Sequence, residues 1–501
     1  MTLVRVRLLI AVLAIAVAEL GCGDTFRPVA VPINSTPPNP SSLHFMLTLS
    51  TNGDCDPLVI NQPCNRGAST RIDVPGDSEI GAAQVGLNPV HAVLLPDGDD
   101  VFVANQLEDT VSFYSPSGIS PVFTLTLPAG SRPDFVETTQ NNTVYVANAG
   151  NNTVSVITTD NNAVDNTIPV GPSPVALAEM PNGQKLYVAN FGTGVAPVNG
   201  SVMSVNTVDD SVNPVIAPPA GSAWNAPTWI VTRSDNARVY VLDQGTGIVA
   251  AIDTSSDTVV GTATVGAGAN FMLYNTAGNR LYITNPVTAT LTILDATTAP
   301  SSPTDPLTVL TSMSFAASNA ANAPCPTGCI PVSVAALPDG SRAYVATYQI
   351  TPSTCTNPTQ APPCIVAQAT VINLANNSVS KTIPVGVLNP NAPLTVPPTF
   401  QPDTPVPMVG TTAGPVAECS FVRFRLFAAA SADSTRVYLS YCDAGATAVI
   451  STVPDTSPGA QSGEDYLVNE LSAPVSALSP PSSPAGQQPP PQSPVFVLAG
   501  P

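Results

Sequence analysis

The sequence has few positive charges, very few histidines and no long hydrophobic run after its N-terminus. Its 501 residues contain 15 lysines and arginines against 34 aspartates and glutamates. A nucleic-acid partner is therefore not expected, because phosphate binding requires a basic surface. The two histidines, His44 and His91, leave little material for a histidine-rich metal site or for the base of a nucleophilic triad.

Helical patterning is also missing after the first twenty residues. Charged residues make up 10% of the chain, and the residues that dominate it favour strands and turns. No glycine-rich phosphate loop opens a helix, and the aspartates of the turn at 96–100 lack the spacing of a calcium-binding EF-hand. The pattern thus leans away from an enzyme without deciding the question, and neither a cofactor nor a metal is expected.

A strand-like motif is present instead, and it occurs seven times. Its aromatic residues are 42 or 43 positions apart over part of the chain, with wider steps of 53, 62 and 94. A repeat of roughly 40–45 residues that is rich in strand formers is typical of β-propeller blades. The seven copies are VFVAN (Val101–Asn105), VYVAN (Val144–Asn148), LYVAN (Leu186–Asn190), VYVLD (Val239–Asp243), LYITN (Leu281–Asn285), AYVAT (Ala343–Thr347) and VYLSY (Val437–Tyr441).

Other segments recur around this motif. A stretch ending in a Pro-Asp-Gly turn precedes it, as at Pro89–Gly98, and an outer strand reading TIPVG follows at Thr167–Gly171 and Thr382–Gly386. In these features the chain resembles the YVTN-repeat β-propeller family over residues 79–452. The resemblance implies an exported or surface protein. Some related propellers are lactonases or quinone-enzyme subunits, and seven blades are the commoner number in the family.

The N-terminal end of the repeat region holds an incomplete blade. Phe45–Asn52, Ser69–Val74 and Ile80–Gly86 have the pattern of the second, third and fourth strands, without a first. The last residues, PVFVLAGP (Pro494–Pro501), match PVHAVLLP (Pro89–Pro96) proline for proline.

A strand at about 493–500 is therefore expected to complete the N-terminal blade, which leaves no loose sheet edge. We predict an all-β fold, a single β-propeller over residues 44–501 with eight four-stranded blades, one of them split between the chain ends. Seven blades remain the alternative.

The first residues indicate export. Arg5 and Arg7 precede an apolar run, Leu8–Ala18, that is too short to span a membrane, so residues 1–21 are predicted to be a signal peptide. Two cleavage sites are possible, one after Ala16-Val17-Ala18 and one before Cys22.

The second site resembles a bacterial lipobox, Glu19-Leu20-Gly21-Cys22, although Glu19 departs from the pattern. We favour lipidation of Cys22, with the Pro- and Ser-rich residues 22–43 as a tether. An outer-membrane or cell-surface lipoprotein that faces the periplasm or the exterior is expected. Ordinary cleavage would give a soluble periplasmic or secreted protein.

The remaining eight cysteines support export, because disulfides persist in oxidising compartments. They form four close sets in the sequence, and no pair has the two-residue spacing of a zinc site. Eight cysteines permit 105 connectivities, so local pairing is a hypothesis. The expected pairs are Cys55/Cys64, Cys325/Cys329, Cys355/Cys364 and Cys419/Cys442.

Two regions are candidates for binding. The first is a set of long insertions that the propeller topology places mainly on one face, next to the cysteines, where loops on a rigid scaffold commonly carry function. The alternative is that these insertions arose without a function and that the disulfides only stabilise them. These insertions are Gly53–Ala68, Thr311–Ile330, Tyr348–Gln368 and Val387–Glu418.

The second region is the inner strand of each blade. Counting eleven residues back from each motif aromatic gives positions that either line the axis or pack between blades: His91, Asp134, Ala176, Trp229, Phe271, Ser333 and Phe427. A buried, hydrogen-bonded role is the plainer interpretation of His91, as is inter-blade packing for Trp229 and Phe271.

Three further residues are ligand-binding candidates. Arg423 and Arg425 alternate on the expected inner strand of the last blade, so they either bind an anion at the axis or pair with a buried acid such as Glu137 or Glu179. Trp224 lies in a loop without an obvious core role and is a candidate for ligand stacking.

The sequence therefore favours an exported, lipid-anchored β-propeller that acts as a binding or interaction module at the cell envelope. The partner is an unknown envelope protein, glycan or small molecule, the membrane is contacted only through the lipid, and a monomer is expected. Two alternatives stay open. One is a lactonase-like or quinone-cofactor enzyme, which rests on fold analogy, and the other is a passive structural surface protein.

Overall fold

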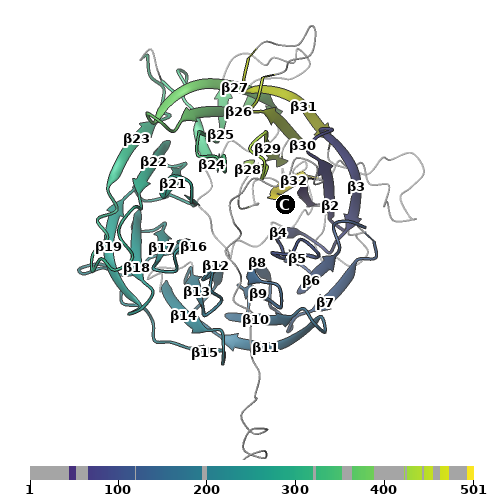
Figure 1. Ribbon diagram of the computed structural model, residues 1–501, viewed down its shortest axis with the longest axis vertical. Helices are drawn as coiled ribbons and strands as arrows, with labels where there is room; N and C mark the ends of the chain where they lie inside the picture. The colour runs from purple at the N-terminus through teal and green to yellow at the C-terminus, as the bar shows by residue number, and fades with distance from the viewer. Residues whose placement is uncertain are drawn as a thin grey trace, which may run out of the picture.

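Eight sheets of four antiparallel strands surround a common axis (Figure 1). The computed structural model describes residues 44–51, 66–118, 120–193, 200–319, 323–351, 364–388, 423, 426–442, 445–454, 463–472 and 493–500. Within these ranges, no helix is long and apolar enough to cross a membrane. The eight-bladed propeller is confirmed, and the seven-bladed alternative is wrong.

Each blade runs from an inner strand beside the axis to an outer strand at the rim. Blades 1 to 4 consist of β32 (Ser493–Ala499), β1 (Phe45–Thr51), β2 (Ala68–Asp73), β3 (Ser78–Gln84); β4 (Pro89–Leu94), β5 (Val101–Asn105), β6 (Thr110–Tyr114), β7 (Phe123–Thr126); β8 (Pro133–Gln140), β9 (Thr143–Asn148), β10 (Thr153–Thr158), β11 (Ala163–Pro169); and β12 (Pro174–Glu179), β13 (Lys185–Asn190), β14 (Ser201–Asn206), β15 (Ser211–Val212).

Blades 5 to 8 continue in the same order. They consist of β16 (Pro227–Thr232), β17 (Arg238–Asp243), β18 (Ile248–Asp253), β19 (Thr258–Thr264); β20 (Phe271–Asn275), β21 (Arg280–Asn285), β22 (Thr290–Asp295), β23 (Val309–Ser314); β24 (Ile330–Ala336), β25 (Arg342–Thr351), β26 (Cys364–Asn373), β27 (Ser378–Leu388); and β28 (Leu426–Ala430), β29 (Arg436–Tyr441), β30 (Ala446–Ser451), β31 (Tyr466–Ser472).

Blade 1 joins the two ends of the chain. Its inner strand β32 pairs with β1, with Phe496 opposite Leu49 and Leu498 opposite Leu47. The Gly500 amide also donates a hydrogen bond of 2.8 Å to the Phe45 carbonyl. The predicted closure is confirmed, and it gives β1 a partner along the side that faces the axis.

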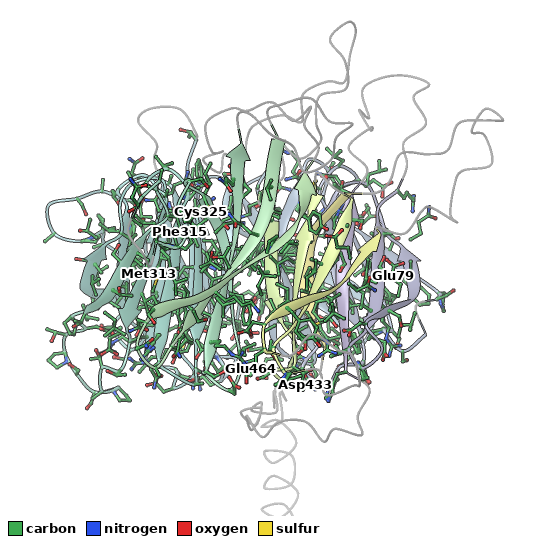
Figure 2. The ribbon with its side chains drawn as sticks, turned by 90° about the horizontal axis from the view of Figure 1, so that it is seen from above. Glu79, Met313, Phe315, Cys325, Asp433 and Glu464 are labelled. Carbon is green, nitrogen blue, oxygen red and sulfur yellow. A yellow bond between two sulfur atoms is a disulfide. The ribbon has the colours of Figure 1, made fainter. Side chains whose placement is uncertain are left out.

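The antiparallel order sorts the connections onto two faces. We call the face that carries the connections between first and second and between third and fourth strands the turn face, and the opposite one the loop face. In Figure 2, Asp433 and Glu464 lie at the turn face, and Phe315 and Cys325 lie toward the loop face. Because β1 begins and β32 ends on the turn face, both ends of the described propeller lie there.

The longest connections all belong to the loop face, as expected, but parts of the predicted insertions are strand. β25 and β26 pair as far as Thr351 and Cys364, and β27 reaches Leu388. Residues 311–314 likewise belong to β23. β-branched residues such as Ile350, Thr351 and Ile365 continue the ladder between β25 and β26, which loop length alone did not reveal. Residues 52–65, 352–363 and 389–422 lie outside the described residues.

The asparagine that ends the repeated motif is buried and binds backbone. Asn105 accepts a hydrogen bond from the Gly86 amide (3.0 Å) and donates to Ser112 (2.9 Å). Asn285 donates to the Gly266 carbonyl (2.9 Å). In these two blades a buried amide therefore supplies polar partners to the connection that enters the blade, which would otherwise bury unpaired backbone groups.

The motif tyrosines do more than pack. In blades 4 to 8, Lys or Arg stands two residues before the tyrosine and reaches the next blade. Lys185 and Tyr187 both bind Asp257 of blade 5, with Nζ–Oδ2 at 2.9 Å and Oη–Oδ1 at 2.6 Å. The corresponding pairs at the following junctions are Arg238 with Asp305, Arg280 with Asn377, Arg342 with Asp465 and Arg436 with Asp77.

The conformation of the turns explains why most of these partners are aspartate or asparagine. Asp77, Asp257, Asn377 and Asp465 have φ between 46° and 60°, a conformation that short Asp and Asn side chains tolerate. One residue thus shapes the turn and binds the neighbouring blade.

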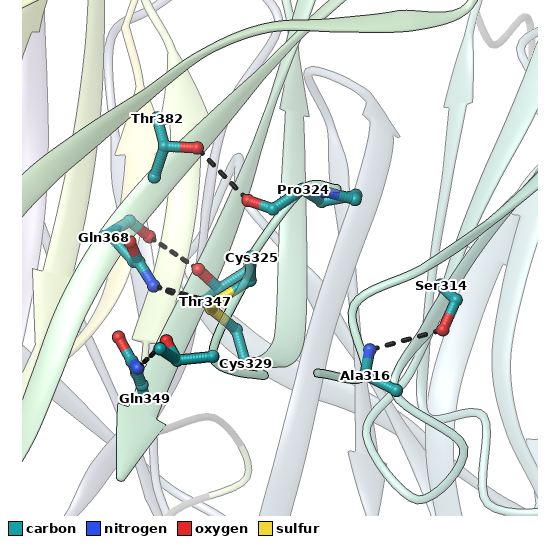
Figure 3. The surroundings of a disulfide bond; sticks show 10 residues. Ser314, Ala316, Pro324, Cys325, Cys329, Thr347, Gln349, Gln368 and Thr382 are labelled. Atoms are coloured by element: carbon teal, nitrogen blue, oxygen red, sulfur yellow. Dashed lines mark hydrogen bonds between the residues drawn. A yellow bond between two sulfur atoms is a disulfide. The ribbon is translucent and has the colours of Figure 1, made fainter. Parts of the chain in front are cut away.

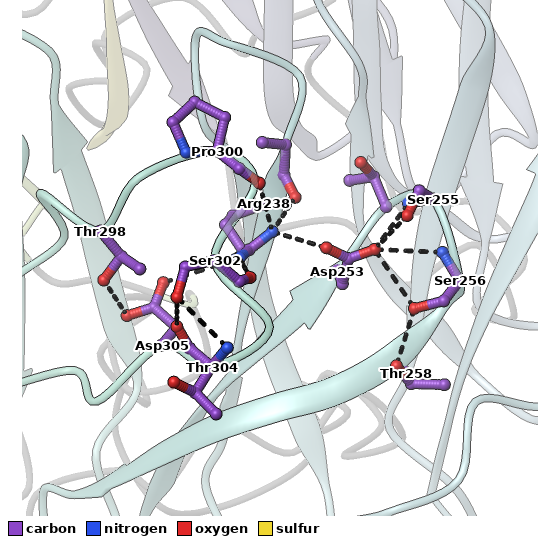
Figure 4. Close-up of polar contacts among 12 residues, drawn as sticks. Arg238, Asp253, Ser255, Ser256, Thr258, Thr298, Pro300, Ser302, Thr304 and Asp305 are labelled. Atoms are coloured by element: carbon purple, nitrogen blue, oxygen red, sulfur yellow. Dashed lines mark hydrogen bonds and ion pairs between the residues drawn. The ribbon is translucent and has the colours of Figure 1, made fainter.

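The junction of blades 5 and 6 is the most buried of these (Figure 4). The Arg238 and Asp305 side chains are fully buried with 3.7 Å between Nε and Oδ2, and Arg238 also lies 2.7 Å from Asp253. The guanidinium donates further to the Ser302 and Pro300 carbonyls. Buried charge is tolerated here because it is paired and hydrogen-bonded.

One disulfide, Cys325–Cys329, lies on the loop face beside β26 (Figure 3). Gln368 Nε2 donates to Cys329 Sγ at 2.7 Å. Cys442 is disulfide-bonded too, while its expected partner Cys419 lies outside the described residues.

The other predictions on cysteines fall largely in the same undescribed parts. Cys22, Cys55, Cys64 and Cys355 lie outside the described residues, as do the predicted signal peptide and tether. Cys364 is described only as part of strand β26.

Candidate functional site

Eight equivalent positions on the inner strands form a layer around the axis. In most blades this position is the second residue after the proline that opens the strand, and a shift in pairing register separates the two. Six of the eight side chains are aromatic, and two are small. The positions are occupied by His91, Phe135, Ala176, Trp229, Phe271, Ser333, Phe427 and Phe496.

The six aromatic side chains form a closed circuit, which we call the aromatic ring. Each contacts the next across the gaps left by Ala176 and Ser333. The centroid distances are 3.8 Å for His91–Phe135, 5.9 Å for Phe135–Trp229, 5.1 Å for Trp229–Phe271, 5.8 Å for Phe271–Phe427, 4.6 Å for Phe427–Phe496 and 4.5 Å for Phe496–His91. Stacked and edge-on contacts of this kind stabilise a close packing of side chains around the axis.

The count of eleven residues was wrong in blade 3. There the first hairpin closes with a two-residue turn between Gln140 and Thr143, so Phe135, not Asp134, takes the ring position. For Trp229 and Phe271, the two alternatives are both true. Each side chain lies at the axis, and there it packs against a side chain of another blade.

Arg423 lies on the loop-face side of the aromatic ring. Its guanidinium donates to the Val175 carbonyl (2.8 Å) and to the Thr228 carbonyl, and Nη1 lies 3.5 Å from Asp134 Oδ2. It also lies 4.6 Å from the centroid of the Trp229 ring, a cation–π distance.

Two expectations about this arginine are corrected. Strand β28 begins at Leu426, so Arg423 precedes the inner strand. Its described acidic partner is Asp134 rather than Glu137 or Glu179. Arg423 comes before β28 in the chain, so it lies next to the start of β8, where Asp134 is. Burial lowers the pKa of Arg423 to about 10 against the favourable charge of Asp134. Arg425 lies outside the described residues.

A chain of polar side chains leads from blade 1 to this arginine. Thr51 donates to Asn88 (2.8 Å), Asn88 donates to Gln106 (2.9 Å), and Gln106 donates to Asp134 (3.1 Å). Single-residue reasoning missed Asn88 and Gln106, although both stand at strand ends next to the repeated motifs. The groups satisfy one another, as a partly buried polar network must.

His91 is stacked on Phe135 and accepts a hydrogen bond from the Val136 amide at Nδ1 (3.5 Å). Burial, with a smaller effect of the Arg423 charge, lowers the pKa of His91 to about 3. The imidazole is therefore neutral near pH 7, and its basicity is far from the value that suits a general base. The other histidine, His44, is buried at the start of β1.

Trp224 has a core role that its sequence context hid. It is 4% exposed, and its Nε1 donates to the Ile216 carbonyl at 2.8 Å. The indole ring is buried and its N–H group has a hydrogen-bond acceptor, as is usual for a buried tryptophan.

A second layer lies on the turn-face side of the aromatic ring, two residues further along each inner strand. Six of its eight side chains are partly exposed although they belong to the innermost strands. The layer is apolar except in blade 3, and it consists of Val93, Glu137, Ala178, Val231, Leu273, Ala335, Ala429 and Leu498.

Glu137 is the ionisable member of this layer. Burial and the charge of Glu179 raise its pKa to about 8, opposed by a hydrogen bond from the Glu179 amide. In return Glu179 Oε2 accepts from the Thr139 amide (2.6 Å) and hydroxyl (2.9 Å). Blades 3 and 4 are thus joined by carboxylates on inner strands, whereas the junctions from blade 4 round to blade 1 use a lysine or arginine with an aspartate or asparagine.

In the described ranges, no three His, Cys, Asp or Glu side chains converge as metal ligands. His91 is held by ring stacking, and Asp134 and Arg423 bind each other.

Comparisons with known proteins place the chain beside other structures only distantly. No model of a protein family matches the sequence, and a search of characterised proteins finds no relative. A periplasmic gluconolactonase from Pseudomonas aeruginosa is 13% identical, with 92% of this chain and 99% of that chain covered and a TM-score of 0.48. A putative 6-phosphogluconolactonase from Bacteroides uniformis is 16% identical, with 69% and 98% covered and a TM-score of 0.47.

Hydrazine synthase from Kuenenia stuttgartiensis is also similar, with 14% identity, 77% of this chain and 86% of that chain covered, and a TM-score of 0.43. The activities named for these proteins are theirs. The propeller fold of this chain rests on its own strand pairing, and membership of the YVTN-repeat family stays a prediction.

Proposed function

We propose that this chain is an exported, lipid-anchored β-propeller that acts as a binding module at the cell envelope and presents its loop face to the partner. The observation that carries the proposal is that the ends of the propeller and its long connections lie on opposite faces. Both ends of the described propeller lie on the turn face, while the longest connections start and finish on the loop face. A tether at residues 22–43 would therefore reach the turn face and leave the loop face directed outward.

The disulfide supports an extracytoplasmic location, since such bonds persist in oxidising compartments. The polar network that ends at Arg423 supports binding on the loop-face side, because loops and strand ends on a rigid scaffold commonly carry recognition. The charged groups of this network, Arg423 and Asp134, bind each other, which disfavours the lactonase-like or quinone-cofactor alternative.

The anchor is tested by metabolic labelling with a palmitate analogue in a bacterial host. The wild-type chain is expected to take up label and fractionate with membranes, and Cys22→Ala is expected to do neither. A labelled Cys22→Ala protein would contradict lipidation at this residue.

Partner binding is tested with immobilised propeller and an envelope extract divided into protein, glycan and lipid fractions. One fraction is expected to be retained by the wild type and lost when residues 389–422 are replaced by a short Gly-Ser turn. Replacing the turn-face segment 455–462 in the same way serves as the matched control and is expected to leave retention unchanged. Equal retention by all three proteins would favour a passive structural role.

A further inference from the structure

The outer edges of the eight blades differ in how they are protected against pairing with another strand. The outer strand of a sheet exposes unpaired amide and carbonyl groups, and proteins usually block such an edge with a charge, a proline, a short strand or a covering segment. Two outer strands are short, with four residues in β7 and two in β15. Four others, β3, β11, β27 and β31, carry a charged residue, namely Glu79, Asp165, Lys381 and Glu470.

The edge of β19 is covered by a segment of the next blade. The Asp305 amide donates to the Val260 carbonyl at 3.1 Å, so the connection between β22 and β23 crosses this edge. Seven of the eight outer strands are therefore protected in one of the usual ways.

β23, the outer strand of blade 6, is the exception. Its six residues, VLTSMS, include neither a charge nor a proline, and it is the last strand of its sheet. In the described ranges it pairs with β22 alone. It lies on the rim (Figure 1), where Val309 and Leu310 are 48% and 38% exposed. This edge thus combines open backbone groups with exposed apolar side chains.

Part of β23 has the regular geometry that strand pairing requires. A bulge lies between Val309 and Thr311, as in most of the outer strands. From Thr311 to Ser314 the pairing with β22 is uninterrupted. The Phe315 amide donates to the Ala289 carbonyl. Because backbone groups alternate in direction along a strand, the amide and carbonyl of Ser312 then point away from β22.

We propose that this edge of β23 pairs antiparallel with the same edge of a second copy of the chain, about a two-fold axis at Ser312. An antiparallel edge is its own complement, because the two Ser312 residues would each give and receive one backbone hydrogen bond. The exposed Val309 and Leu310 of both copies flank the contact. Two-fold pairing closes after two copies, so it forms a dimer and not a fibre.

Charge favours a second copy as the occupant. The chain has a formal net charge of −19, so most surfaces of two copies repel each other. Between Asp305 and Asp339 the sequence contains no charged residue, and β23 lies within this stretch. Two copies therefore meet here without opposing side-chain charges from the paired strands, whereas a strongly basic or acidic partner strand would find no counter-charge on β23.

The small size of the contact sets its strength. A pair of such short strands covers much less than the roughly 1,200–2,000 Å² buried in stable interfaces. The chain is therefore expected to be monomeric in dilute solution and to pair at high local concentration. The rim is separate from the loop face, so this contact goes beyond the proposed function and does not compete with it.

Sedimentation velocity tests the pairing on the full mature chain with Cys22→Ala, so that a lipid at this residue does not contribute. The mean mass is expected to rise from monomer toward dimer between micromolar and millimolar concentrations. Ser312→Lys is expected to abolish the rise, because two cations would face each other across the two-fold axis. Ser380→Lys, at an exposed position of β27, is the matched control and is expected to retain it.

Both substitutions are at exposed side chains, and equal melting temperatures confirm that the variants are folded. A wild type that stays monomeric over the whole range would overturn the proposal. Dimerisation of Ser312→Lys to the same extent as the wild type would also overturn it, since the contact would then lie elsewhere.

Cross-linking locates the two-fold axis. Ser312→Cys is expected to give a disulfide-linked dimer under mild oxidation, because directly opposite residues of antiparallel strands have Cβ atoms about 4.5–5.5 Å apart. Ser380→Cys is the control and is expected to cross-link at least tenfold more slowly. Equal rates for the two variants would refute the assignment.

A peptide with the sequence of residues 308–315 separates a second copy from a foreign partner strand. It is expected to slow the cross-linking of Ser312→Cys, whereas a scrambled peptide is not. Binding of the peptide to a chain that never dimerises would assign the edge to a strand of another protein, and would overturn the proposal of a second copy.

Discussion

Arg436 of blade 8 holds Asp77 of blade 1 through two parallel hydrogen bonds, Nε–Oδ1 at 2.8 Å and Nη2–Oδ2 at 2.9 Å. The two residues are 359 positions apart in the sequence. Blade 1 therefore has two links across the chain ends, the β32–β1 ladder beside the axis and this bidentate pair at the turn face. Bidentate pairs combine charge with fixed geometry, so they suit a closure that must keep its register.

Replacing Arg436 by alanine is expected to lower the free energy of unfolding by about 2–4 kcal/mol, because Asp77 would keep a largely buried charge without its partner. The double variant R436A/D77N is expected to lose less than the two single variants together. Lys381→Ala, at an exposed position, is the control. Additive losses in urea melts would contradict a direct coupling.

Deleting residues 490–501 is expected to lower the melting temperature sharply, since β1 would lose its inner partner and the aromatic ring would lose Phe496. Phe496→Ala alone is expected to cost about 3–5 kcal/mol, as for other large-to-small changes of buried aromatic residues. Ile80→Ala, 48% exposed on β3, is the comparison. An unchanged transition in the deletion, followed by calorimetry, would show that the ring closes without β32.

The pH dependence of stability should carry the signature of Glu137. Its pKa is raised from 4.5 to about 8 in the folded chain, so between these values the native state binds the proton more tightly than the unfolded state. The contribution of this group to stability is therefore greatest below about pH 4.5 and is lost as pH rises through about 8.

Glu137→Gln is expected to flatten that part of the stability profile, measured as urea midpoints from pH 5 to pH 9. Glu79→Gln provides the matched change on an exposed strand. A wild-type profile that rises across this interval by the amount removed in Glu137→Gln would reverse the sign and contradict the assignment.

Arg423→Met is expected to cost about 3–5 kcal/mol, because Asp134 would keep a buried charge without its cation. The double variant R423M/D134N is expected to recover part of this loss. In a Trp224→Phe background, Trp229 is the remaining tryptophan, and its fluorescence should change when the guanidinium is removed from its ring. Unchanged emission would place Arg423 elsewhere.

Replacing Cys325 and Cys329 together by serine is expected to cost about 2 kcal/mol in the chain-entropy picture, since the closed loop is short. Gln368 would lose its sulfur partners in the same change. Non-reducing peptide mapping of the wild type checks the bond, and free thiols at both positions would contradict it.

The sequence determined the propeller, its eight blades and the completion of blade 1 by the C-terminal strand. Those features follow from local repetition: the aromatic strand core, the tight turn and the matched prolines of Pro494–Pro501 and Pro89–Pro96 each recur in readable form. It also indicated the pairing of Cys325 with Cys329, because a four-residue separation makes a local bond easy to form.

Only the tertiary structure decided what the inner strands do. A hairpin one residue shorter moved Phe135 into the aromatic ring and Asp134 toward Arg423. The hydroxyls of Tyr187 and Tyr344 donate to aspartates of the next blade, which are 70 and 121 residues away in the sequence. Partners of this kind are set by the angle between neighbouring blades, and the periodicity of one strand carries no record of that angle. For the same reason the sequence did not show the raised pKa of Glu137, which comes from burial and from Glu179 of the next blade.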